Sequence, residues 1–312
     1  MNAVACSIQS LLETLGPEMA LEWRAGKAGA FAPLPPEHCS HGAALVNPLN
    51  PITPTGIQVI GPEEMAHLAN LSPTERKQTL QGIFSQAVAV ILSQGVEATA
   101  ELLDAADENK TPLLAASLEP VQLLSHLRYH LNERLAERIT VHGVCMEVLG
   151  TGILLTGESN VGKSELALEL VTRGHRLIAD DAPELARVTP GILQASCPPL
   201  LQDFLEVRGL GVLNIRFMYG DNAIKKKKNL RLVIELRTHA SAETDASRLY
   251  GNNGSREILG ITLPVIIIPV APSRNLGVLV EAAVRKHQLH NSGYDAAKDL
   301  EQRQGNLLEG GQ

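Results

Sequence analysis

The chain has 312 residues, of which 44% are hydrophobic, 20% charged and 3% aromatic, and its formal net charge is −7 at pH 7. This composition is that of a globular protein long enough for two domains. The negative charge argues against binding to nucleic acids or anionic membranes, because both require a basic surface. No stretch approaches the roughly 18 apolar residues of a membrane-spanning helix, and the N-terminus has no signal-peptide pattern.

The cysteines are widely spaced and form no Cys-x-x-Cys pair, at Cys6, Cys39, Cys145 and Cys197. In a chain of this length, that pattern predicts reduced thiols in a cytoplasmic protein. The segment "EHCSH" at residues 37–41 contains potential metal ligands. It lies in a proline-rich loop without a second group of ligands, so we do not assign a metal site there.

The first half of the chain alternates between predicted helices and strands. A helix is predicted to begin at Pro73, because Ser72 can cap it and Glu75 can complete a capping box. A buried strand, a helix, a second strand and a long amphipathic helix are predicted next, at residues 87–92, 99–107, 112–117 and 119–137. This order predicts an N-terminal α/β domain with a parallel sheet, assigned to residues 1–133.

The second half, assigned to residues 134–312, contains more strands. Apolar runs predict them at residues 139–150, 152–157, 175–181, 185–196, 230–236 and 263–270. The turn Thr189-Pro190-Gly191 inside one run predicts a hairpin. A helix at residues 164–174 ends at Gly174, and the final helix is predicted at residues 279–289. We therefore expect a mixed, largely β core with flanking helices.

One segment of the second half, "GESNVGKS", matches the phosphate-binding loop G-x-x-x-x-G-K-[S/T] and lies between a predicted strand and a predicted helix. Gly157 and Gly162 allow backbone N–H groups to turn toward phosphate oxygens, and the helix N-terminus adds its positive end. Lys163 is expected to reach the β- and γ-phosphates, and Ser164 to bind Mg²⁺. The predicted nucleotide-binding residues are Gly157, Glu158, Ser159, Asn160, Val161, Gly162, Lys163 and Ser164.

Two adjacent carboxylates, Asp180 and Asp181, end the next predicted strand. Adjacent residues of a strand point to opposite sides, so one can face the phosphates while the other supports the structure. A carboxylate beside the γ-phosphate can accept a proton from an incoming hydroxyl. The alternative is turn formation before Pro183. The sequence contains no N-K-x-D motif, which argues against a GTPase.

Three further features of the second half allow both a functional and a structural interpretation. In "LEVRGLGVLNI", Glu206 and Arg208 alternate before two glycines, which suits a metal–phosphate site or else a surface ion pair at a turn. His142 is a lone strand histidine, which acts in catalysis only if its hairpin brings it to the phosphates. The four lysines at 225–228 form either a mobile loop that attracts an acidic partner or effector, or a solvated turn between strands.

Together these segments resemble the bacterial HPr kinase/phosphorylase family. The resemblance rests on "GESNVGKSELALELVTRGHRLIADD" and "EVRGLGVLNI", and with residues 11–26 and 248–283 it extends over nearly the whole chain. It implies a bifunctional cytoplasmic enzyme. Such enzymes use ATP and Mg²⁺ to phosphorylate a regulatory serine of the HPr phosphocarrier protein, and inorganic phosphate to remove that group as pyrophosphate. It also implies a hexamer, built from an N-terminal α/β domain and a C-terminal P-loop kinase domain like that of phosphoenolpyruvate carboxykinase.

The resemblance also assigns roles to individual residues. It implies that Asp181 takes the serine proton in the forward reaction and returns it in the reverse reaction. The Mg²⁺ ligands would be Ser164 and Glu206. The remaining implied catalytic residues are His142, Lys163 and Arg248. Residues 205–214 match the family's signature strand, and residues 269–274 match a segment tied to dephosphorylation.

The sequence departs from the family pattern at three positions. The family reads P-V-R-P-G-R-N where this chain has "PVAPSRN", so Ala271 removes a cation and Ser273 replaces a glycine that allows free turning. This weakens the expectation of phosphorylase activity relative to kinase activity. Asn160 replaces a glycine of the loop, and asparagine tolerates left-handed geometry better than most residues.

Two other functions use the same motifs. A kinase for a small molecule would turn over without a protein acceptor. A regulatory protein gated by ATP would bind a partner without transferring phosphate, and Asp181→Asn would leave its signalling intact. The position of Asp181 near Lys163, together with Glu206, favours chemistry over sensing.

Overall fold

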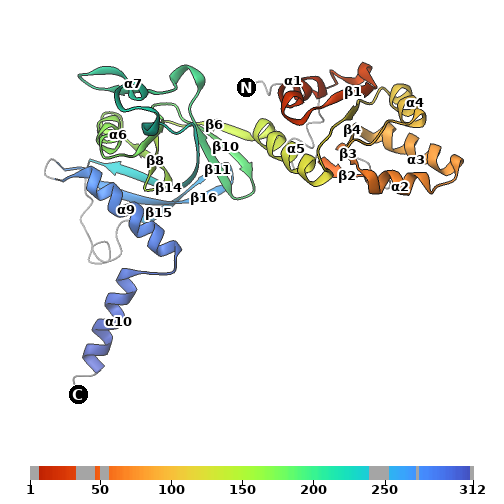
Figure 1. Ribbon diagram of the computed structural model, residues 1–312. Coiled ribbons are helices and arrows are strands. Elements are labelled where there is room, and N and C mark those ends of the chain that lie inside the picture. Colours follow the sequence, from red (N-terminus) through yellow and green to blue (C-terminus); the bar gives the residue numbers. More distant parts are fainter. Residues whose placement is uncertain (1–6, 33–45, 50–55, 239–252, 272–273, 310–312) are drawn as a thin grey trace. The chain divides into compact units, whose positions relative to one another are not determined.

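The computed structural model describes residues 7–32, 46–49, 56–238, 253–271 and 274–309 (Figure 1). The chain divides into two compact units, Met1–Ala136 and Glu137–Gln312. In the described part of the chain, no helix is both long and apolar enough to cross a membrane.

The first unit contains a five-stranded sheet in the order β1-β5-β4-β3-β2. Its strands β2 to β5 are parallel neighbours, and β1 pairs antiparallel with β5. The strands are β1 (Glu22–Ala25), β2 (Val46–Pro48), β3 (Gly56–Ile60), β4 (Ala87–Leu92) and β5 (Leu113–Ala115). The predicted parallel α/β sheet is therefore confirmed.

Helices cover both faces of this sheet. Because successive strand residues point to opposite faces, Ile57 and Ile91 pack against α1 and α5, whereas Ile60 and Leu92 pack against α2, α3 and α4. The helices are α1 (Ile8–Met19), α2 (Pro62–Ala69), α3 (Pro73–Gln86), α4 (Ala100–Asn109) and α5 (Pro120–Leu135), with a 3₁₀ turn η1 (Lys27–Gly29). Strands that are buried on both faces explain the continuous apolar runs of the sequence.

The predicted start of α3 is confirmed. The Ser72 hydroxyl accepts a hydrogen bond from the Glu75 N–H, and the Glu75 carboxylate accepts one from the Ser72 N–H at 3.1 Å. This reciprocal capping box satisfies two backbone donors that a helix N-terminus otherwise leaves unpaired.

The second unit has a larger, mixed sheet in the order β6-β10-β11-β14-β8-β7-β9, with β16 on β14 and β15 on β16. Its strands are β6 (Glu137–Thr140), β7 (Val144–Val148), β8 (Thr151–Gly157), β9 (Arg176–Ala179), β10 (Glu184–Thr189), β11 (Ile192–Ser196), β14 (Lys227–Arg237), β15 (Asn253–Ile258) and β16 (Ile261–Pro269). A separate hairpin consists of β12 (Phe204–Val207) and β13 (Gly211–Asn214). The predicted β10–β11 hairpin around Pro190 and Gly191 is confirmed.

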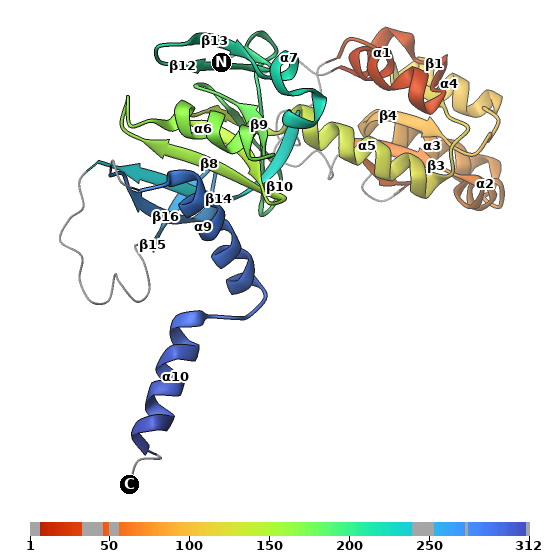
Figure 2. The same ribbon diagram turned by 60° about the vertical axis from the view of Figure 1, so that its left-hand side comes forward.

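Helices α6 and α9 pack on one face of the strands β8 and β14 (Figures 1 and 2). Ile153 and Ile234 contact these helices, whereas Leu154 and Val233 face the other side, where β10, β11, β15 and β16 contribute a second core. The helical elements are α6 (Lys163–Thr172), α7 (Ile215–Tyr219), α9 (Leu276–Asn291) and α10 (Ala296–Glu309), with 3₁₀ turns η4 (Pro199–Leu201) and η5 (Asp221–Ala223).

The structure corrects three predictions for this half. The run at residues 139–150 is two strands, because Gly143 has a φ of +153° and the chain turns there from β6 to β7. The helix predicted at 279–289 corresponds to α9 and is not the final helix. A further helix, α10, follows it and was not predicted because it is largely polar. The four lysines are not a single loop, since Lys227 and Lys228 begin β14 and the Lys228 Nζ lies 2.7 Å from a Glu147 carboxylate oxygen.

Candidate active site

The candidate site lies at the carboxyl ends of parallel strands of the second unit. Strands β8, β14 and β16 are parallel to one another, and β9 runs in the same direction because both β8 and β9 pair antiparallel with β7. The phosphate-binding loop follows β8, and Asp180 and Asp181 follow β9. Loops at this edge of an open α/β sheet commonly bind ligands.

The backbone of the loop requires its glycines. Gly157 has a φ of +147°, and a Cβ atom there would lie 2.5 Å from the Leu236 carbonyl oxygen. Gly162, with a φ of +94°, is the N-cap of α6 and makes no side-chain capping bond. Asn160 has a φ of +63°, so it takes the left-handed geometry expected for it. The N–H groups at the start of α6 therefore remain available to an anion.

The lysine of the loop lies inside it. Lys163 is 8% exposed, and its Nζ donates to the carbonyl oxygens of Gly157 at 3.1 Å and Glu158 at 2.9 Å. The ammonium group is therefore held against the first residues of the loop, where phosphate oxygens would lie.

The two adjacent aspartates have different surroundings. Asp180 is 7% exposed and accepts hydrogen bonds from the Ser164 hydroxyl at 3.3 Å and from the Glu206 N–H at 2.9 Å. Burial raises the pKa of Asp180 above its usual range, against the opposing effect of these bonds. Asp180 thus joins three segments, which leaves Asp181 as the open carboxylate.

Asp181 is exposed to the cavity and contacts the predicted histidine. Its side chain is 72% exposed, its backbone is left-handed with a φ of +63°, and its Oδ1 lies 3.1 Å from His142 Nδ1. The turn between β6 and β7 carries His142, and the Gly143 N–H donates to the Asp181 carbonyl oxygen at 3.3 Å. This turn brings His142 to the end of β9, as its functional interpretation requires.

The β12–β13 hairpin supplies two more side chains. Alternation along β12 buries Leu205 and Val207, so Glu206 is exposed. Together with Arg208 it lines a cavity of about 420 Å³, whose other titratable or hydroxyl-bearing residues are His142, Ser159, Lys163, Ser164, Glu165, Asp180 and Asp181.

Two glycines form the turn of this hairpin. Gly209 and Gly211 have φ values of +83° and +80°, and no described atom lies within 4 Å of a Cβ added at either position. These left-handed values require glycine at both positions of the turn.

The oxygen atoms in this cavity suit Mg²⁺. Ser164, Asp180, Asp181 and Glu206 offer a hydroxyl and carboxylates, which are the ligands that this hard cation prefers. In the described ranges, no three His, Cys, Asp or Glu residues are grouped closely enough to hold a metal by themselves. Mg²⁺ typically binds one or two protein groups together with substrate phosphates, so the residues present fit an ion that is shared with a nucleotide.

Some predicted residues cannot be placed. Arg248, Ser273 and the "EHCSH" segment all lie outside the described residues. Ala271 is described, and its carbonyl oxygen accepts a hydrogen bond from the Arg274 N–H at 3.1 Å.

A second cavity, of about 500 Å³, adjoins the first and was missed by sequence reasoning. His142 lines both cavities. The second cavity is otherwise lined by Thr156, Gly157, Glu158, Glu235, Leu236, Arg237, Thr238 and Arg256. Apart from Gly157 and Glu158, which belong to the phosphate-binding loop, no local motif marks these residues, because they come from separate strands and meet only when the sheet forms.

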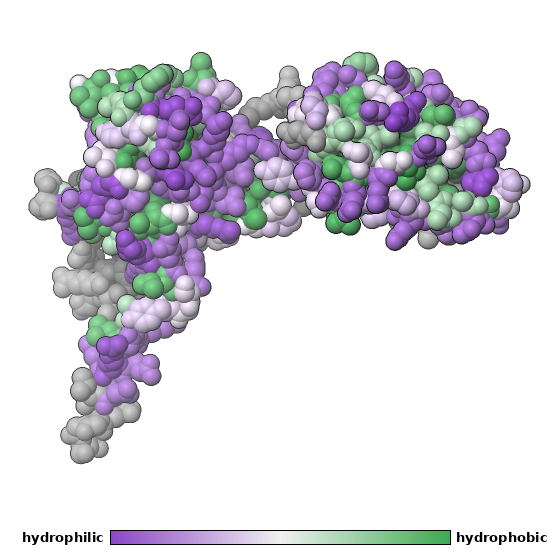
Figure 3. Space-filling view, in the orientation of Figure 1, coloured by the Kyte–Doolittle hydropathy of each residue, from purple (hydrophilic) through white to green (hydrophobic). Residues whose placement is uncertain are grey.

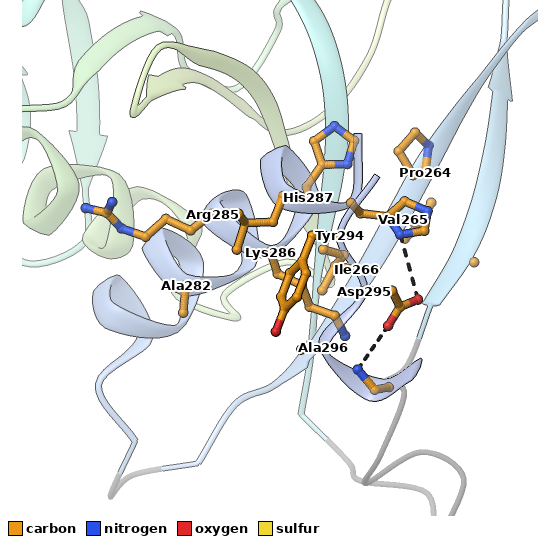
Figure 4. Close-up of a pocket in the computed structure, with 14 residues that line it drawn as sticks. Pro264, Val265, Ile266, Ala282, Arg285, Lys286, His287, Tyr294, Asp295 and Ala296 are labelled. Carbon is orange, nitrogen blue, oxygen red and sulfur yellow. Dashed lines mark hydrogen bonds and ion pairs between the residues drawn. The ribbon is translucent and has the colours of Figure 1, made fainter. Parts of the chain in front are cut away.

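A third cavity lies away from the phosphate-binding loop, between β16, the end of α9 and the start of α10 (Figure 4). Its lining is mainly apolar, and Asp295 there pairs with His290 and accepts a hydrogen bond from the Ala297 N–H. It contains no residue of the predicted site.

Exposed apolar side chains gather on the hairpin that carries Glu206 and on the adjoining helix α7. Figure 3 shows an apolar surface over this part of the second unit. Its large exposed residues include Phe204, Leu210, Val212, Phe217 and Met218. A contiguous apolar surface of this kind marks a place where another protein can bind.

Comparison with known proteins matches both halves of the chain. Residues 6–131 match the family model described as HPr Serine kinase N terminus, and residues 133–304 match the HPr Serine kinase C-terminal domain. A protein named HPr kinase/phosphorylase from Xanthomonas euvesicatoria pv. vesicatoria (strain 85-10) is 46% identical over 296 residues, which cover 94% of each chain. One of the same name from Stenotrophomonas maltophilia (strain K279a) is 45% identical over 305 residues, with 96% of each chain covered.

Among solved structures, the Hpr(Ser) kinase/phosphatase from Coxiella burnetii is 33% identical, and the match covers 52% of this chain and 98% of that chain with a TM-score of 0.48. The family models and the curated relatives together span nearly the whole sequence. On that basis, the chain belongs to the HPr kinase/phosphorylase family.

Proposed function

We propose that this protein is a bifunctional HPr kinase/phosphorylase that moves a phosphoryl group between ATP or inorganic phosphate and a regulatory serine of HPr. The observation that carries the proposal is the meeting of Lys163, His142 and Asp181 around one cavity at the phosphate-binding loop. Family membership and the names of the relatives support HPr as the acceptor.

In the kinase direction, the serine Oγ of HPr attacks the γ-phosphorus of ATP. A bond forms between these atoms, the bond from the γ-phosphorus to the β–γ bridging oxygen breaks, and ADP leaves. The serine proton passes to the Asp181 carboxylate, which His142 orients through their 3.1 Å contact. Lys163 and the loop amides stabilise charge on the transferred group.

In the phosphorylase direction, an oxygen of inorganic phosphate attacks the phosphorus of phosphoserine. The bond to the serine oxygen breaks, pyrophosphate forms, and Asp181 returns its proton to the serine. Residues 269–274 carry Ala271 where the family has arginine. We therefore expect the phosphorylase reaction to be slower than the kinase reaction. Arg248 is proposed to clamp phosphate on the strength of the resemblance.

Ser164 and Glu206 are the proposed Mg²⁺ ligands. When bound, the ion supplies positive charge to the phosphate oxygens during transfer. Asp180 supports this site, since its carboxylate accepts hydrogen bonds from both the Ser164 hydroxyl and the Glu206 N–H.

The apolar surface beside Glu206 supports a protein acceptor over a small molecule. A small substrate would need only the cavity, whereas HPr must place a serine at Asp181 and cover the surrounding surface. We also propose that residues 1–133 form a domain for assembly or regulation, that residues 134–312 form the catalytic domain, and that the protein acts as a cytoplasmic hexamer. These proposals rest on the family resemblance.

The first test is to mix the protein with HPr, ATP and magnesium chloride and to determine the mass of HPr by intact mass spectrometry. We expect the gain of one phosphate, abolished by Lys163→Ala and slowed about 10²–10⁴-fold by Asp181→Asn. The exposed Lys77→Ala on α3 serves as the control and should leave the rate unchanged.

The two alternative functions give different results. Turnover of ATP with unmodified HPr would favour a kinase for a small molecule. Binding of ATP and HPr without turnover, unaffected by Asp181→Asn, would favour the regulatory protein.

A further inference from the structure

The inference concerns the base of the β12–β13 hairpin, which carries Glu206 at the proposed site. The hairpin is a separate two-stranded sheet that lies over α6, outside the large sheet (Figure 2). Two strands by themselves are only marginally stable. Leu205 and Val207 pack into the core that includes α6, but apolar packing has no preferred direction. Polar contacts are therefore needed to fix the position of the Glu206 side chain.

Polar contacts hold the hairpin at two points. The first is the hydrogen bond from the Glu206 N–H to the Asp180 carboxylate. The second lies at the base, where Asp203 precedes β12 and α7 follows β13. There the Ile215 N–H donates to the Asp203 carbonyl oxygen at 2.9 Å. The Asp203 carboxylate holds the guanidinium group of Arg216, with Oδ2 at 3.0 Å from Nε and Oδ1 accepting a hydrogen bond from Nη2 at 3.4 Å.

Asp203 is the main partner of this guanidinium group. Its side chain is 15% exposed, and that of Arg216 is 38% exposed. The Nε atom of Arg216 is buried and has no hydrogen-bond partner in the described part of the chain, so its contact with Asp203 is an ion pair. Asp221 also lies 3.4 Å from Nε, but its side chain is 87% exposed, and water weakens such a pair.

The backbone of Asp203 shows why this contact matters for Glu206. Asp203 has a φ of +72°, in the left-handed region that is uncommon for residues other than glycine. Such a conformation persists only where surrounding contacts hold it. Because φ at this residue sets the direction in which the chain enters β12, its relaxation would displace the Glu206 side chain further along the strand.

We propose that Arg216 is a positioning residue for phosphoryl transfer. By holding the Asp203 carboxylate, it fixes the left-handed entry into β12 and keeps Glu206 where it can share Mg²⁺ with Ser164 and the nucleotide. The described lining of the catalytic cavity does not include Arg216, so Arg216 acts through Asp203 and the hairpin. The inference rests on the proposed function in that Glu206 is taken as a ligand of Mg²⁺.

The test measures how much Mg²⁺ adds to nucleotide binding. The affinity of the full-length protein for the β,γ-imido analogue of ATP is determined calorimetrically in magnesium chloride and in EDTA. Arg216→Gln and Asp203→Ala should reduce the gain from Mg²⁺ about three- to tenfold, with the affinity in EDTA changed less than about twofold. Arg216→Lys keeps the charge without the planar fork and should lie between wild type and Arg216→Gln. Asp221→Ala is the matched control and should leave the gain unchanged.

A second pair of measurements separates positioning from general damage. If Arg216 acts through Glu206, then adding Arg216→Gln to Glu206→Gln should reduce the gain from Mg²⁺ less than about twofold further, whereas independent damage would add to the loss. Hydrogen exchange gives a readout without any ligand. In Arg216→Gln, the amides of β12 should exchange faster while those of α6 keep their wild-type rates.

Two outcomes would overturn the inference and leave the proposed function intact. The first is a gain from Mg²⁺ that falls in Glu206→Gln and stays at the wild-type value in Arg216→Gln and Asp203→Ala. The second is an equal loss of affinity in magnesium chloride and in EDTA, which would make the contact purely structural. An unchanged gain in Glu206→Gln itself would instead contradict the proposed ligand role of Glu206, and the inference would fail with it.

Discussion

Two strand-to-helix turns of this protein occupy similar positions in their sheets and have different functions. In the first unit, β3 leads into α2 through Gly61; in the second, β8 leads into α6 through the loop from Gly157 to Gly162. Both strands are buried, and both turns lie at the carboxyl end of a parallel strand. They differ in what meets the N-terminus of the helix.

In the first unit, the protein closes the turn itself. A single residue separates β3 from α2, and the Gly61 N–H donates to the Glu64 carboxylate at 2.8 Å. Glu63 and Glu64 also place negative charge in the first turn of α2, which favours the positive end of the helix. This turn needs no ligand.

Both N-cap residues are glycines without a side-chain capping bond, but in the second unit the loop is longer and, among the described residues, no carboxylate accepts the Gly162 N–H as Glu64 accepts that of Gly61. The positive end of α6 is therefore left to a ligand with negative charge. The comparison teaches that element order alone does not make a phosphate site. The site depends on whether a side chain of the protein already occupies the helix N-terminus.

The largest effect on stability should come from adding a side chain at Gly157, in the turn between β8 and α6. In Gly157→Ala, the added Cβ meets the Leu236 carbonyl oxygen at 2.5 Å while φ stays at +147°. We expect the second unit to lose about 3 kcal/mol or more of stability and to bind ATP poorly. Hydrogen exchange of the amides in β8 and α6 measures the loss.

The matched variant is Gly61→Ala, in the turn between β3 and α2. Its Cβ would meet side-chain atoms of Pro120 at 2.8 Å and Glu64 at 2.9 Å, and its φ of −101° is open to alanine. The Glu64 side chain can rotate away, whereas the Pro120 ring is closed onto its own backbone, so the cost should be about 1–2 kcal/mol, below that of Gly157→Ala. Equal costs for the two alanine variants would contradict the distinction between the turns.

A smaller effect on stability is expected at the C-terminal end of α6. Glu281 on α9 accepts two hydrogen bonds from Arg173, at 2.9 and 2.6 Å, and contacts His175 Nε2 at 2.9 Å. Both residues directly follow α6. Glu281→Gln should lower the stability of α6 and α9 by about 1–3 kcal/mol, measured by hydrogen exchange at pH 7. The exposed Glu257→Gln on β15 is the control.

This contact also predicts a dependence on pH. The bonds from Arg173, and then from His175, lower the pKa of Glu281 to about 2, whereas an unfolded glutamate has a pKa of about 4.3. A lowered carboxylate pKa stabilises the fold fully above the unfolded value, and this contribution is lost as pH falls toward 2. The difference between wild type and Glu281→Gln should therefore shrink from pH 4.3 downward. A constant difference would show that charge is not its cause.

The smallest effect on stability is expected from removing the Glu64 carboxylate that caps the turn between β3 and α2. Glu64→Ala removes the acceptor of the Gly61 N–H and should lower the stability of the first unit by about 1 kcal/mol. Glu64→Gln keeps an acceptor and should cost less. Trp23 is the only tryptophan of the chain and lies in β1, so its fluorescence during urea unfolding reports on this unit. ATP affinity should not change, and a change would link the two turns.

Sequence reasoning succeeded where the signal is local. The capping box at Ser72 and Glu75, the hairpin at Pro190 and the left-handed Asn160 each depend on a few neighbouring residues. It failed at α10, whose largely polar sequence has a weak pattern, and in the run at 139–150, which Gly143 divides.

The site shows the same division. The phosphate-binding loop and the pair of aspartates could be found by spacing alone. Which aspartate is buried could not, because Asp180 accepts the backbone N–H of Glu206, 26 residues away. Nor could the second cavity, which joins Thr156 on β8 to Arg256 on β15, although β14 and β16 lie between these strands.

By itself, the sequence determined the α/β class, the phosphate-binding loop and the residues able to act on a proton. These follow from backbone preferences and side-chain chemistry within short segments. Only the tertiary structure decided that His142 meets Asp181, that Lys163 turns into its own loop, and that a polar cavity opens at the end of β14. Such contacts depend on strand order in the sheet, which long-range packing sets and no local pattern encodes.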